Sequence, residues 1–447
     1  MIRLLICAVA LWGCGVPKRA GFDDVERLVR ERGVDRIHWN QGTAEDAEVD
    51  HLVGELVARP LTAASAVEIA LFNNPRLQAT YEKLGVAQAD VVQAGLLKNP
   101  AFSIGIGFPL SSGLGTEYEF SLVQDFLDLF LIPVKKRFAR AEHEAVKLEV
   151  ADAVLALQAE VREAFYTVEG AQQIVELGRA LAEAAQASAE LAERQRQAGN
   201  VSALDAVEEQ ALAAQTHLDL LRAEEELRDA RERLTRLCGL WGERARWRIE
   251  ARLEELPPPS VEAALDDLEP RAVARRLDVQ LARRHVETAR AALPVARAGV
   301  IGGFELGAQG HQDPDHDGRV LGPSLRLEIP IFDQHQALLF KLRARLRAAE
   351  RTLDAVTLEA RSEVRAARDH LLSTRAIVEY YRVHALPLRE RTVVLAQEQY
   401  SAMLLGVFQL LSAKQAQIRT YREYLQSVRD YFIARAQLER VAGGPIK

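Results

Sequence analysis

Two short stretches decide the fold: Gln124-Asp125-Phe126-Leu127-Asp128 and Ile329-Pro330-Ile331-Phe332-Asp333. Each closes a segment with the alternating pattern of a β-strand and opens a long segment with helical periodicity. The first helical run breaks at Gly199-Asn200-Val201-Ser202, and the second breaks after a similar length at Gly406-Val407. This spacing predicts an internal repeat with a period of about 205 residues, so that each half of the chain contains one of two matched helical hairpins.

Apolar residues follow a sustained three-and-four spacing along these arms, which is coiled-coil periodicity. The seam changes from Val and Leu to Ala toward Gly199, so we expect neighbouring helices to approach more closely there. No proline falls between Pro133 and Pro257, and about 64 helical residues would span ~95 Å. The outgoing seam of the first hairpin is Val150, Val154, Leu157, Val161, Ala164, Val168, Ala171, Val175, Gly178, Ala182, Ala185, Ala189 and Ala192.

Each helical arm is preceded by a pair of segments in which apolar and polar residues alternate. The apolar positions are Phe102, Ile104, Ile106, Phe108, Tyr118, Phe120, Leu122, Phe304, Leu306, Ala308, Leu325, Leu327 and Ile329. The opposite face carries Glu117, Glu119, Glu305, Arg326 and Glu328. This pattern is typical of a transmembrane β-barrel with lipid outside and water inside.

Four strands cannot close a barrel, and open sheet edges are not tolerated in hydrocarbon. We therefore expect the strands to be pooled between chains, so that three chains supply twelve strands. The alternative is that these are surface hairpins of a soluble domain. The charged inner face and the lack of another predicted sheet to cover the apolar face argue against it.

The first 14 residues read as an export signal. Arg3 precedes a short apolar run, and Leu11-Trp12-Gly13-Cys14 resembles a lipobox, which predicts lipidation of Cys14 after cleavage. The alternative is an ordinary cleaved signal with an incidental cysteine. A formal net charge of −7 argues against non-specific nucleic-acid binding. No later apolar run reaches the ~18–20 residues that a spanning helix needs.

From Leu61 to Gly443 the chain resembles the TolC-like outer-membrane efflux protein family. The resemblance is carried by the stretch from Leu61-Thr62 to Asn73-Asn74-Pro75, by residues 93–100, and by Gly199, Ser202 and Asp205, which fit a GxxSxxD tip motif. It implies a homotrimer with a twelve-stranded barrel, an α-helical tunnel and a periplasmic tip that is closed at rest. It also implies a periplasmic adaptor and an inner-membrane pump as partners, and it implies no catalysis.

Two departures concern the tips. Gln409 and Ser412 stand where the second tip would carry the Ser and Asp of the motif, while Phe408, Leu410 and Leu411 are apolar. We therefore predict an apolar gate at the second tip, with Asp205, which follows Ser202 at the first tip, helping to hold neighbouring helices in the closed position. Gly199 and Gly406 are expected to allow the tight reversals, because glycine reaches positive φ without steric cost. The alternative is that the apolar residues pack the hairpin or bind the adaptor.

The predicted fold class is mainly α with a membrane β-barrel. A signal peptide over residues 1–13 and an N-terminal extension over residues 14–60, expected to wrap the tunnel, precede the two repeats. The first repeat covers residues 61–256, with strands at about 101–109 and 117–127 and a helical hairpin at about 134–240. The second covers residues 257–447, with strands at about 301–309 and 320–331 and a helical hairpin at about 334–440.

The predicted function is passive export of small solutes, such as drugs or metal ions, through the outer membrane from the periplasm. Two alternatives stay open: the outer channel of a type I protein-secretion system, and a periplasmic coiled-coil scaffold without a pore. We expect no catalytic residues, no metal site and no cofactor. Residues 313–318 resemble the start of a calcium loop, but Ser324 stands where that loop needs its bidentate Glu.

Overall fold

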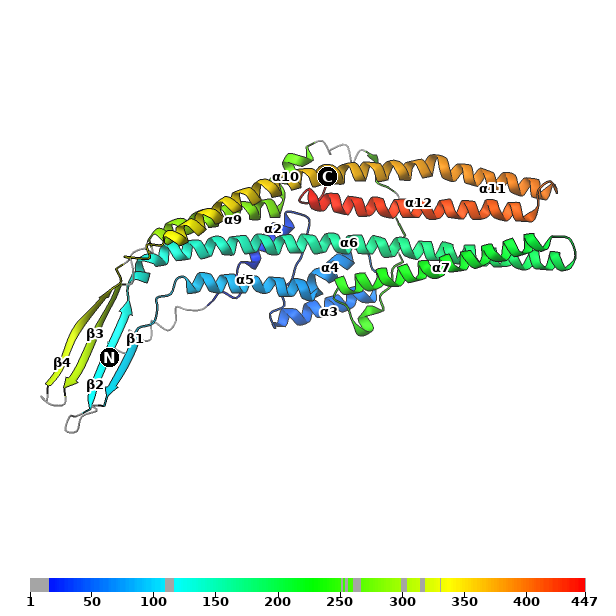
Figure 1. The fold of residues 1–447 in the computed structure, drawn as a ribbon. Helices are drawn as coiled ribbons and strands as arrows, with labels where there is room; N and C mark the ends of the chain where they lie inside the picture. Colours follow the sequence, from blue (N-terminus) through cyan, green and yellow to red (C-terminus); the bar gives the residue numbers. More distant parts are fainter. Residues whose placement is uncertain are drawn as a thin grey trace. The chain divides into compact units, whose positions relative to one another are not determined.

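The computed structural model describes residues 16–108, 116–250, 252–253, 256–259, 267–298, 304–313, 318–329 and 331–446. Cys14 and residues 314–317 lie outside the described residues. The order of elements is shown in Figure 1. They are α2 (Phe22–Arg30), α3 (Ala44–Ala58), α4 (Ala63–Asn73), α5 (Pro75–Gln93), β1 (Ala101–Gly107), β2 (Glu117–Asp125), α6 (Leu127–Gln197), α7 (Ala203–Leu237), the 3₁₀ helix η1 (Gly242–Ala245), α8 (Leu268–Arg275), α9 (Leu277–Ala298), β3 (Phe304–Asp313), β4 (Gly318–Leu327), α10 (Gln336–Tyr380), the π-helical η3 (Tyr381–Ala385), α11 (Leu386–Ser401) and α12 (Val407–Val441).

The chain divides into two compact units. The strand unit comprises Met1–Val25, Glu82–Val150 and Leu277–Thr357, and the hairpin unit comprises Glu26–Tyr81, Ala151–Arg276 and Leu358–Lys447. The predicted mainly helical fold with four antiparallel strands is confirmed. Across the described part of the chain, no helix is both long and apolar enough to span a bilayer.

In the strand unit the four strands form one antiparallel sheet in the order β1-β2-β3-β4. The pairing Gly105↔Glu119 sets the register between β1 and β2, and Glu305↔Arg326 sets it between β3 and β4. The pairing Asp125↔Glu305 joins the two predicted hairpins into one sheet through β2 and β3. β3 runs to Asp313, beyond the predicted end near residue 309, because it continues to pair with β4 there.

The hairpin unit is packed along the predicted seam. Val154, Val161 and Val168 of α6 are fully buried. Farther along, one core cluster of the first hairpin contains Ile174, Val175 and Ala223, and the next contains only Ala185, Ala189 and Ala213. The change to alanine toward the turn therefore follows the seam predicted from the sequence.

The second hairpin has its own apolar core, closed by aromatic contacts. The ring of Tyr166 stacks on that of Phe432 with centroids 5.1 Å apart, and Tyr431 lies edge-on to Phe432. The other buried members of this cluster include Leu268, Val364, Leu371, Val378, Val428, Leu438 and Ile446. Aliphatic residues from α8, α10 and α12 thus share one core.

Two helix boundaries differ from the prediction. α6 begins at Leu127 rather than near residue 134, so it includes Pro133 in its second turn. A proline there removes only one backbone hydrogen bond near the helix end, which is tolerated. The outgoing arm of the second hairpin is interrupted by the π-helical η3, which ends two residues before Pro387. The missing N–H of Pro387 cannot continue the α-helical ladder, and a wider turn accommodates the defect.

Candidate channel surfaces

One face of the sheet is apolar and exposed in the single chain. The pairs Phe102↔Leu122, Ile104↔Phe120 and Leu306↔Leu325 all lie on this face. The exposed fraction is 63% for Phe102, 64% for Leu325 and 81% for Leu321. An apolar face of this size needs a cover, since soluble chains rarely expose large contiguous apolar patches.

The opposite face carries the predicted acidic residues. Glu119 pairs with Gly105 and Glu117 with Gly107, and the side chain of each glutamate lies against its glycine. Arg326 Nη1 lies 3.0 Å from Glu305 Oε2, so this positive charge is paired across the strands. Glu328 follows the last residue of β4 and is exposed. Four of the five predicted lumen residues therefore lie on one face of the sheet, and Glu328 lies just beyond it.

Sequence reasoning missed two further residues of this face. His311 lies directly opposite Glu119, and its Nδ1 is buried without a hydrogen-bond partner among the described residues. Asp125 lies opposite Glu305 and accepts a 2.9 Å hydrogen bond from Lys98 Nζ. Two-residue alternation counted from Glu305 would have placed His311 on this face, because side chains alternate along a strand.

At the first helical tip, Gly199 has φ +78°. Its N–H donates to the Arg196 carbonyl at 3.0 Å, and the Asn200 N–H donates to the Gln195 carbonyl at 2.9 Å. This is a Schellman motif, which ends a helix with a left-handed residue, usually glycine. The prediction that Gly199 adopts positive φ at the reversal is confirmed.

Ser202 and Asp205 cap the helix that follows. The backbone N–H of Asp205 donates to Ser202 Oγ at 3.1 Å, and Ser202 Oγ donates to Asp205 Oδ2 at 2.8 Å. Ser202 is thus the N-cap of α7. Nearby, hydrogen bonds from Arg196 and Gln197 lower the pKa of Glu193 to about 2.

At the second tip, the expectation that Gly406 supplies the positive φ is wrong. Gly406 has φ −77° and is the N-cap of α12, whereas Met403 has φ +58°. The N–H of Met403 donates to the Tyr400 carbonyl at 3.0 Å, and the N–H of Leu404 donates to the Gln399 carbonyl at 2.8 Å. The Schellman motif is therefore retained, with a methionine in the left-handed position.

The predicted gate residues of the second tip differ in exposure. Leu410 is 8% exposed and packs within the chain, while Phe408 and Leu411 are half-buried. Among the large apolar residues of this turn, Met403 is 94% exposed and Leu404 78%. Sequence reasoning missed both, although they stand only three and two residues before Gly406, on which the predicted turn was centred.

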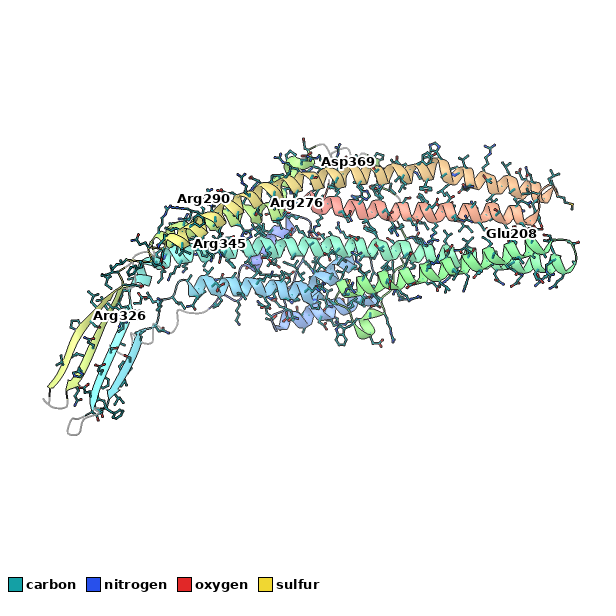
Figure 2. All side chains as sticks on the ribbon, viewed as in Figure 1. Glu208, Arg276, Arg290, Arg326, Arg345 and Asp369 are labelled. Atoms are coloured by element: carbon teal, nitrogen blue, oxygen red, sulfur yellow. The ribbon has the colours of Figure 1, made fainter. Side chains whose placement is uncertain are left out.

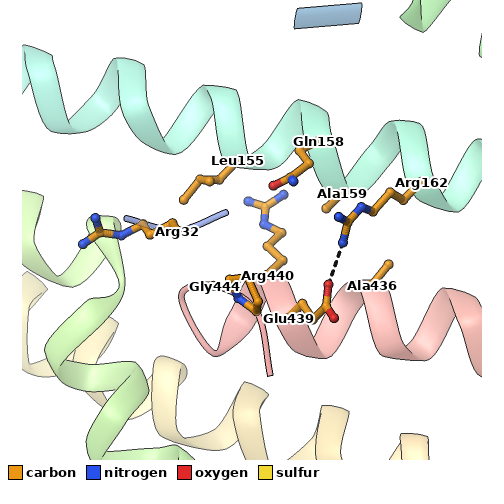
Figure 3. Close-up of a pocket in the computed structure, with 10 residues that line it drawn as sticks. Arg32, Leu155, Gln158, Ala159, Arg162, Ala436, Glu439, Arg440 and Gly444 are labelled. Carbon is orange, nitrogen blue, oxygen red and sulfur yellow. Dashed lines mark hydrogen bonds and ion pairs between the residues drawn. The ribbon is translucent and has the colours of Figure 1, made fainter. Parts of the chain in front are cut away.

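A small pocket in the hairpin unit shows how the end of α12 is joined to α6. Arg162 and Glu439 form an ion pair at 2.6 Å, and Arg32, Gln158, Arg440 and Gly444 lie around it (Figure 3). The cavity has a volume of about 30 Å³, enough for a water molecule. Within the described residues, no group of three His, Cys, Asp or Glu side chains could hold a metal ion.

Comparison with known proteins decides the family. Residues 66–240 match the family model described as outer membrane efflux protein. This stretch of the chain belongs to the outer membrane efflux protein family. The cobalt-zinc-cadmium resistance protein CzcC of Cupriavidus metallidurans is 26% identical over 402 residues, which cover 86% of this chain and 91% of that protein. This family consists of efflux channels rather than enzymes, which confirms the expectation that the protein is not an enzyme.

Solved structures of two membrane proteins share the fold. A membrane protein from Pseudomonas aeruginosa aligns with a TM-score of 0.72 at 21% identity, covering 85% of this chain and 92% of that chain. The outer membrane protein VceC from Vibrio cholerae aligns with a TM-score of 0.66 at 18% identity, covering 90% and 97%. The fold of long helical hairpins with four strands is thus shared with these two solved structures.

Proposed function

We propose that three copies of this outer membrane efflux protein form the outer-membrane duct of a tripartite pump, which passes small solutes from the periplasm to the exterior. The observation that carries the proposal is the sheet, with its exposed apolar face, its acidic face and its outer strands β1 and β4, each of which pairs on one side only among the described residues. Pairing β4 of one copy with β1 of the next gives twelve strands and leaves no open edge in lipid. The apolar face then contacts hydrocarbon, and the acidic face lines the pore.

Cations are the substrates that this lining favours. Glu117 and Glu119 form no ion pair within the described part of the chain, so three copies give six uncompensated carboxylates. Rings of carboxylates raise the local concentration of cations. The similarity to a cobalt-zinc-cadmium resistance protein supports divalent metal cations as the cargo. The same negatively charged lining would also favour drug-sized cations.

We assign the constriction that closes the channel at rest to the second helical tip. Phe408 and Leu411 form the apolar constriction, and Leu410 supports them from within the hairpin. A periplasmic adaptor opens the tip by binding the splayed form more tightly than the closed one, because a ligand shifts a conformational equilibrium only by its differential affinity. Ser202 and Asp205 keep the start of α7 capped through this change. Cys14 carries the lipid that anchors the chain in the outer membrane.

The experiment is single-channel recording from purified protein in planar bilayers under a salt gradient. Wild type should form cation-preferring channels. Replacing Glu117, Glu119, Glu305 and Glu328 with Gln should shift the reversal potential toward zero. The matched control is Arg326→Gln, which removes the partner of Glu305 and should strengthen cation preference.

Three outcomes would contradict this proposal. Absence of any conductance from correctly folded protein would favour a scaffold without a pore. An unchanged reversal potential in the variant with all four Gln substitutions would show that these glutamates do not line the pore. A requirement for an unfolded polypeptide cargo in export assays would favour the protein-secretion alternative.

A further inference from the structure

Two short segments of the strand unit are strongly basic in a chain whose net charge is −7. The first segment, near the start of α6, and the second, near the start of α10, each contain four basic residues. No Asp or Glu occurs between positions 129 and 141 or between positions 334 and 349. We refer to these as the two basic segments, and their residues are Lys135, Lys136, Arg137, Arg140, Lys341, Arg343, Arg345 and Arg347.

The sheet register places both segments beyond the same edge of the sheet. β2 ends at Asp125, opposite Glu305, and β4 ends at Leu327, opposite Phe304, so both strands leave the sheet where β3 enters it. α6 begins at Leu127 and α10 at Gln336. The basic residues therefore lie roughly 8–20 Å into the two helices, at a rise of about 1.5 Å per residue. Figure 2 labels Arg345 on α10 and Arg326 on β4.

Most of these basic side chains have no hydrogen-bond or ion-pair partner among the described residues. Arg137, Arg140, Lys341, Arg343, Arg345 and Arg347 are exposed and form no hydrogen bond or ion pair among the described residues. Other arginines of the same unit do pair: Arg290 lies 3.4 Å from Glu350, and Arg326 pairs with Glu305. Unpaired charges concentrated in two segments call for an external counter-charge.

Between the sheet and the basic segments lies a belt of exposed apolar residues. Phe332 is 90% exposed, Phe340 70%, Ile331 66% and Ile329 69%. On the α6 side, Leu129 is 52% exposed. The order along each chain segment is thus apolar strand, apolar and aromatic belt, and then basic residues. This is the order of contacts at the hydrocarbon–headgroup boundary of a bilayer.

We propose that the two basic segments bind anionic phospholipid headgroups of the leaflet at the helical end of the sheet. This inference rests on the proposed insertion of the sheet in the outer membrane. The headgroup layer adds only a few ångströms beyond the hydrocarbon, and the long Lys and Arg side chains of the first helical turns reach it. Several basic residues next to a spanning segment attract anionic lipid.

The test is native mass spectrometry of the purified protein with added lipid. The variant carries Arg137→Gln, Lys341→Gln, Arg343→Gln and Arg345→Gln. The matched control removes the same charge from exposed arginines of the hairpin unit that also lack partners among the described residues: Arg361→Gln, Arg382→Gln, Arg389→Gln and Arg391→Gln. The probes are phosphatidylglycerol and, as the uncharged comparison, phosphatidylcholine.

Wild type and control should retain phosphatidylglycerol in preference to phosphatidylcholine. The variant should lose this preference by at least about tenfold. Equal retention of phosphatidylglycerol by wild type and variant would overturn the inference. So would a variant that keeps its lipid but changes the reversal potential, since the basic residues would then line the pore.

Channel recording on the same samples separates the two proposals. Wild type that conducts without preferring phosphatidylglycerol contradicts only the lipid inference. Folded wild type that neither inserts nor conducts contradicts the proposed function itself. The variant should still conduct, because the strands that build the barrel are unchanged.

Discussion

The two helical hairpins have the same backbone plan but different residues at equivalent positions, 204 residues apart. At the tips, Gly199 corresponds to Met403 and Ser202 to Gly406. At the ends of the return helices, Cys238 corresponds to Ala442, and each is followed by a glycine with positive φ, Gly239 or Gly443. The hydrogen bonds that close the helices are the same in both halves.

The comparison shows that a hydrogen-bonding pattern can survive the loss of the residue best suited to it. In the first tip a glycine occupies the left-handed position and a serine caps the next helix. In the second tip a methionine holds the left-handed position, which costs roughly 1–2 kcal/mol for a residue with a Cβ. The second tip is therefore the more strained of the two, and it exposes the large apolar side chains of Met403 and Leu404. These properties suit a turn that changes state.

The largest effect is expected from alanine at the glycine after the first return helix. A Cβ at position 239 would overlap the carbonyl oxygen of Asn73, whose side chain also donates hydrogen bonds to the Cys238 and Gly239 carbonyls. Gly239→Ala should cost about 3–5 kcal/mol, or prevent folding.

The matched change is Gly443→Ala, where the new Cβ would lie 3.0 Å from Arg275 Cβ. It should cost only about 1–2 kcal/mol. Thermal denaturation and the yield of folded protein measure both variants. Equal losses would show that left-handed backbone strain, rather than the contact with Asn73, sets the cost.

The next effect concerns resting conductance at the two tips. Phe408→Ser with Leu411→Ser should raise the conductance of the closed channel several-fold, because an apolar constriction that excludes water is made polar. The equivalent residues of the first tip, Leu204 and Val207, are 67% and 58% exposed. Leu204→Ser with Val207→Ser is therefore the control and should leave the current unchanged. If both pairs act alike, the gate is not specific to the second tip.

Exchange of the left-handed residues should have a smaller effect of opposite sign at the two tips. Gly199→Met should destabilise the first turn by about 1 kcal/mol, and Met403→Gly should stabilise the second by a similar amount. Hydrogen exchange of tip peptides, followed by mass spectrometry, measures both. Faster exchange at the second tip after Met403→Gly would contradict the assignment of strain to Met403.

The smallest effect is expected at Cys238. Its thiol makes a weak 3.6 Å contact with the Ala66 carbonyl, and the equivalent residue of the second hairpin is already alanine. Cys238→Ala should therefore cost about 1 kcal/mol or less. Burial raises the pKa of the Cys238 thiol to about 12. Maleimide should accordingly label it only after unfolding, and rapid labelling of native protein at pH 7 would show that this end of α7 opens.

Much of the fold was determined by local sequence pattern. Alternation placed four strands, three-and-four spacing placed the buried seam from Val154 to Ala192, and breaks in periodicity marked the two turns. These features depend on the period of a helix or strand and on burial of one face, both of which a sequence displays directly. The acidic face followed from the same alternation.

The tertiary structure decided where two patterns compete or where distant segments meet. Gly406 looked like the turn residue because glycine favours positive φ, but the register of the helix that precedes it puts Met403 in that position. The π-helical turn before Pro387 depends on how the helix absorbs a missing hydrogen bond. The pairing of β2 with β3 joins strands that are far apart in the sequence, and it brings Glu305 beside Asp125 and His311 beside Glu119. Such contacts depend on chain positions far apart, so no local pattern encodes them, and only the folded sheet fixes which charges face each other.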